Sequence, residues 1–347
     1  MKMQPVTTRS EAIVVGIGAR TATGLDAQQV ALTWRAGKSW PRESPLVDRA
    51  GEPVATCRLA SIPDDVFGRD RLIALAAPAL AEALAPWGQA HRARAQAAPP
   101  VALLLARPPP DGRADSLLGE MAARAGVAID LARSQELALG RAGGVAAIAL
   151  AMDRLGRGED EAIVVGGVDS LYDPAVLEEL DRARRLHGPS CENGFVPGEA
   201  AGFLLLTRRA TLPALGWIAG AATENEPRPF GSSEPTHGLG MTLAAKRALE
   251  AAGERRVGWV LSDVVYERHR VEEWLFVAGR LSGVIPGDAR HDQPLLKTGE
   301  LAAAAAPVLA VMACALWRAE AAPAGSALVV LHSDGAERGA LLLRRPT

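Results

Sequence analysis

Short runs of β-branched and aliphatic residues alternate along the chain with longer stretches rich in alanine and leucine. Residues 12–15 form such a run and end at Gly16-Ile17-Gly18, a pattern typical of a buried strand that enters a tight turn. The same reasoning predicts strands at 101–105, 162–165, 259–265 and 327–331. It predicts helices at 26–36, 71–85, 142–155, 241–252 and 301–318, the second of them kinked at Pro78 and ended by Pro86. Strands that alternate with helices indicate an α/β protein.

The second half of the chain repeats the order of the first. A helix, a loop and a strand that is followed by Asp169 are repeated as a helix, a loop and a strand that is followed by Asp334. The two helices that open these units are apolar on every side, as expected of helices that are covered on every side. We therefore predict two α/β halves, residues 1–208 and 209–347, in a duplicated five-layer αβαβα sandwich with these helices in the middle layer.

The composition argues against several classes of function. The formal net charge is −2 and the arginines are scattered, so the chain offers no basic surface to nucleic acid or to an anionic membrane. Cys57, Cys191 and Cys314 are too far apart for a zinc site and too few for a disulfide framework, which favours a reducing compartment. We therefore expect neither a metal nor a cofactor.

The apolar segments bear on the location of the protein. The apolar stretch near the N-terminus is too short for a signal peptide. The longest apolar run, Leu301 to Trp317, is mostly alanine, contains Pro307 and is shorter than the roughly 20 apolar residues that a membrane span needs. The run therefore indicates a buried helix rather than a membrane segment, and we predict a cytoplasmic protein.

Four segments, in this order along the chain, carry recognisable motifs. Residues 14–18 read Val-Val-Gly-Ile-Gly, residues 34–39 read Trp-Arg-Ala-Gly-Lys-Ser, and residues 165–170 read Val-Gly-Gly-Val-Asp-Ser. The most specific segment is Gly-Phe-Val-Pro-Gly-Glu-Ala-Ala-Gly at 194–202. Together they resemble the β-ketoacyl-acyl-carrier-protein synthase family, whose motif at the last position is G-F-V-x-G-E-G-A-G. The resemblance implies the thiolase-like form of the predicted sandwich, and it implies a dimer.

The resemblance also implies a catalytic triad that this sequence lacks. The family has a cysteine at the start of a buried helix, where the helix dipole favours the thiolate, and two histidines that stabilise the oxyanion and assist decarboxylation. Counted from the motifs, the matching positions here are Arg141, Asp263 and Glu300. We interpret these three as degenerate triad positions and assign no catalytic residue.

The charges of these three residues suggest another role. A cation at a helix start is unfavourable with the helix dipole by roughly 0.3–1 kcal/mol, and it costs more when it is buried without a partner. Carboxylates could supply that partner, and the fork of arginine suits a bidentate pair. We predict that an Arg141–Asp263/Glu300 ion cluster fills the former active site. The alternative is a register error of one or two positions, which would leave the charges on the surface.

Other polar residues have weaker claims to a function. His269 lies in the charged stretch 266–274 and is interpreted as a solvated loop residue, and His332 as a packing residue near the former site. Cys191 is not at a helix start with a histidine in reach, which argues against a new nucleophile. The spacing of the charges after Asp263 resembles short, cysteine-less synthase-like proteins associated with bacterial secretion-system effector clusters, particularly type VI.

Two functions follow from this sequence. The first is a degenerate β-ketoacyl synthase-like protein that acts as a binding or adaptor protein or as a partner subunit, either like a chain length factor or as an accessory to a secretion effector cluster. Its partners would be a second copy or a related synthase, an acyl-carrier-type protein or a secretion effector. The alternative is a divergent acyl-transferring or hydrolytic enzyme that uses Asp263 or Glu300 as its general base.

Overall fold

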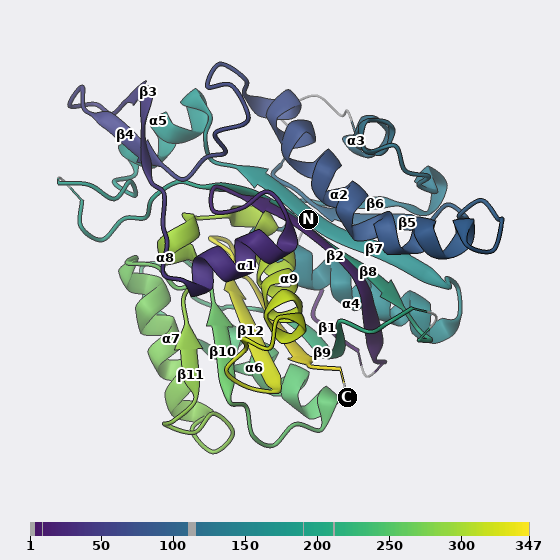
Figure 1. The fold of residues 1–347 in the computed structure, drawn as a ribbon. Coiled ribbons are helices and arrows are strands. Elements are labelled where there is room, and N and C mark those ends of the chain that lie inside the picture. Colours follow the sequence, from purple (N-terminus) through teal and green to yellow (C-terminus); the bar gives the residue numbers. More distant parts are fainter. Residues whose placement is uncertain (1–3, 9, 110–115, 190, 211, 347) are drawn as a thin grey trace.

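The computed structural model describes residues 4–8, 10–109, 116–189, 191–210 and 212–346, and its main feature is a sheet of eleven strands (Figure 1). The strands are β1 Val6–Thr8, β2 Ala12–Thr21, β3 Arg42–Val47, β4 Pro53–Thr56, β5 Ala102–Ala106, β6 Gln135–Leu137, β7 Ala162–Ser170, β8 Glu199–Thr207, β9 Gly216–Asn225, β10 Trp259–Ser262, β11 Arg290–Asp292, β12 Ser326–His332 and β13 Glu337–Arg344. Strands β3 and β4 form a separate two-stranded sheet.

The helices connect these strands and cover them. They are α1 Ala27–Arg35, α2 Gly68–Arg92, α3 Leu118–Ala125, α4 Gly143–Arg157, α5 Pro174–Arg182, α6 Leu239–Ala252, α7 Arg268–Arg280, α8 Leu295–Thr298 and α9 Ala305–Arg318. Three short 3-10 turns, η1 Leu131–Arg133, η2 Gly140–Ala142 and η3 Ala302–Ala304, complete the list. The last two lead directly into α4 and α9.

Ten strands of the large sheet form two halves with the same strand order, and the eleventh, β1, pairs with β9. The order is β6-β5-β7-β8-β2 in the first half and β11-β10-β12-β13-β9 in the second. In both halves the first three strands are parallel to one another and the remaining neighbours are antiparallel. Residues 12–14 of β2 pair with residues 216–218 of β9 and join the two halves at one edge. The division of the chain after residue 208 stays a prediction.

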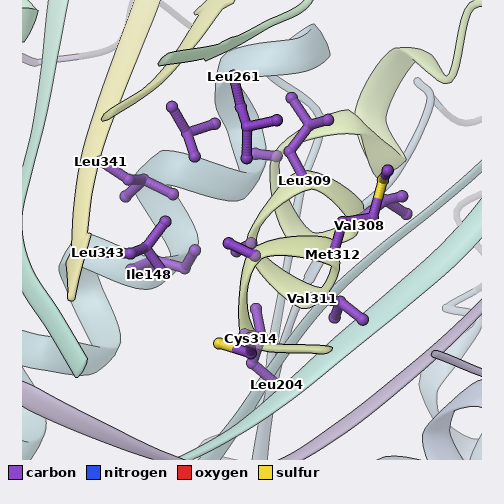
Figure 2. Packing of buried hydrophobic residues seen from close by; sticks show 14 of the residues in the cluster. Ile148, Leu204, Leu261, Val308, Leu309, Val311, Met312, Cys314, Leu341 and Leu343 are labelled. Carbon is purple, nitrogen blue, oxygen red and sulfur yellow. The ribbon is translucent and has the colours of Figure 1, made fainter. Parts of the chain in front are cut away.

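Helices α4 and α9 form the middle layer between the two half-sheets. Helix α4 packs on β5 and β7 of the first half and on β9 of the second, and α9 packs on β2, β8 and β12. Figure 2 shows aliphatic side chains of α9, among them Leu309 and Met312, in the same buried cluster as Leu204 of β8 and Leu341 of β13. Helix α2, with α3 beside it, covers the outer face of the first half, and α6 and α7 cover that of the second. The predicted α/β, thiolase-like five-layer arrangement is therefore confirmed.

Two of the predicted elements differ from the structure. Pro86 was predicted to end the second helix, and this is wrong, because α2 continues through Pro78 and Pro86 to Arg92. A proline inside a helix removes one backbone hydrogen bond. Burial of the apolar face of α2, from Leu72 to Trp87, on the sheet outweighs that loss. The strand predicted at 259–265 ends at Ser262, and the three residues after it enter the site described below.

The longest apolar run of the chain belongs to the protein core. From Ala305 to Trp317 each residue of α9 is buried. Within the described part of the chain, no helix combines the length and the apolar character that a membrane span requires.

Candidate functional site

Three segments that are distant in the sequence meet where the middle helices begin. Arg141 lies in η2 just before α4, Asp263 directly follows β10, and Glu300 lies just before η3 and α9. All three side chains are buried. The alternative, in which these charges lie on the surface, is therefore wrong. The carboxyl ends of β10 and β12 lie side by side here, as expected for neighbouring parallel strands of an α/β sheet.

Two glycines allow the backbone to hold Arg141 and Glu300 at this point. Gly140 has a φ of 60°, and a side chain there would come within 2.9 Å of the Ser333 hydroxyl oxygen. Gly299 has a φ of 78°, and a Cβ there would come within 2.8 Å of the Cys57 Cβ. Glycine alone adopts such positive φ values without strain. The glycine before each charged residue therefore fixes the direction in which the chain presents it.

Arg141 is held by acceptors from the second half of the chain. Its Nε donates to Glu300 Oε1 at 2.9 Å, and its Nη1 donates to Asp334 Oδ1 at 2.8 Å and to the His332 carbonyl at 3.3 Å. Burial by itself would lower the pKa of Arg141, but Glu300 and Asp334 outweigh burial and raise it well above its usual value. The guanidinium is therefore permanently charged and paired.

Glu300 is shared between two arginines. Its Oε2 accepts a hydrogen bond from Arg270 Nη1 at 2.6 Å, while Oε1 accepts those of Arg141 and of the Ala302 backbone N–H. Burial by itself would raise the pKa of Glu300, but Arg141 and Arg270 outweigh it and lower the pKa to about 2. Both carboxylate oxygens are thus occupied, and the group is ionised at neutral pH.

Asp263 does not pair with Arg141, in contrast to the predicted cluster. Its Oδ1 lies 2.6 Å from His332 Nδ1, and its Oδ2 accepts the His332 backbone N–H at 2.7 Å. The reason is the sheet register, because β10 and β12 are adjacent and both end here. Burial would raise the pKa of Asp263, but His332 and the nearby Arg270 lower it. His332 was expected to be a packing residue, but it contacts Asp263 through both its ring and its backbone N–H.

The cluster extends toward the surface through Arg185. This arginine forms a bidentate pair with Glu267, at 2.6 and 3.0 Å, and also contacts both oxygens of Asp334. Arg270 also pairs with Glu267, at 2.9 Å. Asp334 is the most exposed carboxylate of the group. Burial raises its pKa less than Arg141 and Arg185 lower it, so it too stays ionised. Arg141, Arg185, Arg270, Asp263, Glu267, Glu300, Asp334 and His332 are called the central ion cluster below.

The chain is similar to known proteins in part of its sequence and in its fold. Residues 140–211 match the family model described as the N-terminal domain of beta-ketoacyl synthase. None of the curated protein sequences matches the chain significantly.

The fold is shared with solved ketosynthase structures. A complex of a ketosynthase (ApeO) with its chain length factor (ApeC) from Xenorhabdus doucetiae contains a chain with a TM-score of 0.77 and 16% identity, covering 97% of this chain and 98% of that one. The ishigamide ketosynthase/chain length factor has a TM-score of 0.71 and 21% identity, and the match covers 97% of this chain and 99% of that one. A structure of a type II PKS acyl-carrier protein in complex with its ketosynthase contains a chain with a TM-score of 0.72 and 16% identity. The match covers 99% of this chain and 100% of that one. The chain has the ketosynthase fold. The predicted resemblance to β-ketoacyl synthases is confirmed.

No thiolate stands at the centre of this ketosynthase fold. Cys57 packs beside Gly299, but burial raises its pKa to about 12, so its thiol stays protonated. Burial likewise raises the pKa of Cys314, inside α9, to about 12. The Cys191 thiol donates to the Arg184 carbonyl at 2.9 Å in a loop. Cysteine needs its thiolate form to act as a nucleophile. Among the described residues there is also no group of three or more His, Cys, Asp or Glu side chains placed to hold a metal ion.

Half of the central ion cluster was missed from the sequence. His269, in the charged stretch 266–274, was interpreted as a solvated loop residue, and this is wrong, because α7 begins at Arg268. Glu267, Arg270 and Glu273 are spaced three residues apart and form a buried face together with Trp274. This spacing is typical of one face of a helix, and it was the signal in the sequence that could have predicted the buried charges. His269, on the same helix, is half-buried against Phe230, and burial, followed by Arg270 and Arg185, lowers its pKa to about 3.

Proposed function

We propose that this chain is a non-catalytic subunit with the ketosynthase fold, comparable to a chain length factor, that works beside a related and active synthase. The observation that carries the proposal is the state of Arg141, the position assigned to the family's nucleophile. A guanidinium paired with Glu300 and Asp334 stands there, and it can neither attack a thioester nor leave room for a thiolate.

The alternative, an enzyme that uses Asp263 or Glu300 as general base, is less well supported by the contacts. A general base works best when its pKa lies near the operating pH and a lone pair faces the substrate. The pKa of Glu300 is about 2, because burial is outweighed by Arg141 and Arg270. Both oxygens of Asp263 are engaged with His332. Neither carboxylate is free to accept a proton at neutral pH.

The nature of the partner is suggested by similar proteins and by one edge of the sheet. The solved structures named above contain ketosynthases in complex with a chain length factor or with an acyl-carrier protein. In the described part of the chain, β6 is the last strand of the first half-sheet, so its outer edge can pair with another strand. Leu131 is an exposed apolar residue of η1, and a single residue separates η1 from β6 along the chain. The link to type VI secretion effectors stays a prediction.

Acyl transfer is tested directly with loaded carrier protein. The purified chain is incubated with malonyl- and acyl-loaded acyl-carrier protein, and intact-protein mass spectrometry is combined with measurement of released acid and carbon dioxide. We expect no covalent acylation and no turnover above a carrier-only control. Turnover that Glu300→Gln abolishes, while the variant remains folded by circular dichroism, would overturn the non-catalytic interpretation.

Partner binding is tested by co-expression with a ketosynthase and its carrier protein from the same organism. We expect the ketosynthase to co-purify with this chain and its product length to change when the chain is present. Leu131→Arg should weaken the complex. Val47→Arg, an exposed apolar position in the β3–β4 sheet, serves as the control and should leave it intact.

A further inference from the structure

A cavity lies on the outer side of the first half, between the last turns of α2 and the segment in which α3 ends. In Figure 1 both helices lie outside the half-sheet. The cavity has a volume of about 280 Å³ and is lined by side chains between residues 81 and 92, by residues 98, 99 and 101, and by residues 125–128. None of them belongs to the central ion cluster, so this is a separate site.

The walls of the cavity are apolar. Apart from Arg92, each lining residue is aliphatic, aromatic, proline or glycine. Polar groups in the wall are bonded to one another, because Trp87 Nε1 donates to the Pro99 carbonyl at 3.3 Å and Val101 N donates to the Ala128 carbonyl at 3.4 Å. The walls therefore offer a ligand apolar contact, as small-molecule sites typically do.

Arg92 is the charged residue of the lining, and no acidic residue lines the cavity. A Cβ placed on Gly88, one turn earlier, would have the Arg92 guanidinium as its nearest neighbour, with Nη1 at 3.1 Å. The missing side chain at Gly88 thus makes room for the guanidinium to lie back along the helix.

The two ends of α2 differ in how their arginines are paired. Near the start of α2, Arg69 pairs with Glu120 of α3 at 3.1 Å. At the other end, Arg92 has no carboxylate within 4.0 Å among the residues that the structure describes. A guanidinium without a counterion, at the edge of an apolar cavity, leaves its hydrogen-bond donors available to an anion.

We propose that this cavity binds a small aliphatic monocarboxylate, with its carboxylate on Arg92 and its tail against Leu84, Trp87 and Val127. The fork of arginine suits a carboxylate, and the apolar walls suit the tail. A ligand with several charges, such as a nucleotide, would find a single cation here. At roughly 30 Å³ for each atom of the size of a water, the cavity holds about nine non-hydrogen atoms, which is close to the size of octanoate. The site does not depend on the proposed function.

Calorimetric titration of the full chain with octanoate tests the site. We expect one octanoate to bind per chain, with a dissociation constant below about 1 mM. Octanamide, which has the tail without the charge, and acetate, which has the charge without the tail, should each bind at least about tenfold more weakly. Absence of octanoate binding up to about 10 mM, or equal binding of octanamide, overturns the proposal.

Replacement of the cation tests the role of Arg92. Arg92→Gln should raise the dissociation constant of octanoate by about tenfold or more, since a charge-assisted hydrogen bond is lost. Arg94→Gln is the matched control, because Arg94 is an exposed arginine outside the lining, and it should leave the affinity unchanged. Equal losses in the two variants would indicate a general effect of charge and would contradict the assigned role.

Filling the cavity tests where the ligand lies. Gly88→Leu should abolish octanoate binding, because the new side chain takes the place of the Arg92 guanidinium at the cavity. Its melting temperature should not fall, since leucine favours a helix more than glycine does. A folded Gly88→Leu protein that binds octanoate like the wild type would place the ligand elsewhere and overturn the proposal. If this variant did not fold, the comparison of Arg92→Gln with Arg94→Gln would still decide.

Discussion

The starts of α4 and α9 occupy equivalent places in the two halves, yet they carry opposite charges. At α9 the first free N–H groups meet anions, because Ala302 N donates to Glu300 and Ala303 N donates to Asp169, both at 2.9 Å. This is the favourable arrangement with the helix dipole. At α4 the Ala142 N–H meets the neutral Ser333 hydroxyl at 3.0 Å, and the charge is the cation of Arg141.

This difference indicates which contacts hold the centre of the molecule together. The start of α4 does not favour Arg141, so the carboxylates of the second half must hold it there. The Arg141–Glu300 pair therefore also links the two halves.

The largest effect is expected for Glu300→Gln. Arg141 and Arg270 would each lose a buried charged partner, and loss of one member of a buried ion pair typically costs about 3–5 kcal/mol. Urea unfolding followed by circular dichroism measures the loss. Glu250→Gln, on the exposed side of α6, is the control and should change stability by less than about 0.5 kcal/mol. Equal effects for the two variants would contradict the assigned role of Glu300.

A smaller loss, about 1–2 kcal/mol, is expected for Arg141→Met. Glu300 keeps Arg270 and Asp334 keeps Arg185, so no carboxylate becomes unpaired, and the unfavourable cation at the start of α4 disappears. Urea unfolding followed by circular dichroism compares the free energy of unfolding of this variant with that of Glu300→Gln. If Arg141→Met were the more damaging of the two, the comparison between the helix starts would be wrong.

The acid dependence of stability should report the same pair. The folded pKa of Glu300 is about 2, because Arg141 and Arg270 outweigh burial, while its ordinary value is 4.5. Its contribution to stability is therefore fully present above pH 4.5 and declines as the pH falls toward 2. The wild type should lose urea resistance over this range more steeply than Glu300→Gln. Parallel pH profiles would show that Glu300 does not titrate as described.

The last effect, a gain of stability rather than a loss, is expected for Asp169→Asn. Burial raises the pKa of Asp169 from 3.8 to about 6, so its ionised form is less stable in the folded protein. The pH dependence of this contribution is therefore opposite to that of Glu300, and stability declines as the pH rises from 3.8 to 6. The variant lacks this decline, so it should gain stability relative to the wild type between pH 4 and pH 7. A constant difference across this range would contradict the raised pKa.

Local pattern was sufficient for much of the fold. The alternation of aliphatic strands with small-residue helices, the repeated helix–loop–strand unit and the 194–202 motif together predicted the layered ketosynthase fold. These features depend on neighbouring residues, because periodicity reports which faces are buried. Pro86 misled the prediction because burial of the apolar face of α2 outweighs the lost hydrogen bond of one proline.

The sequence by itself determined the charges at positions 141, 263 and 300 and the absence of a cysteine there. Only the tertiary structure decided how these charges pair. Arg141 and Glu300 are 159 positions apart, and Asp263 turned to His332 because β10 and β12 end side by side. The choice of partner among several buried charges depends on which strand ends and helix starts meet in space. Spacing along the chain does not contain that information.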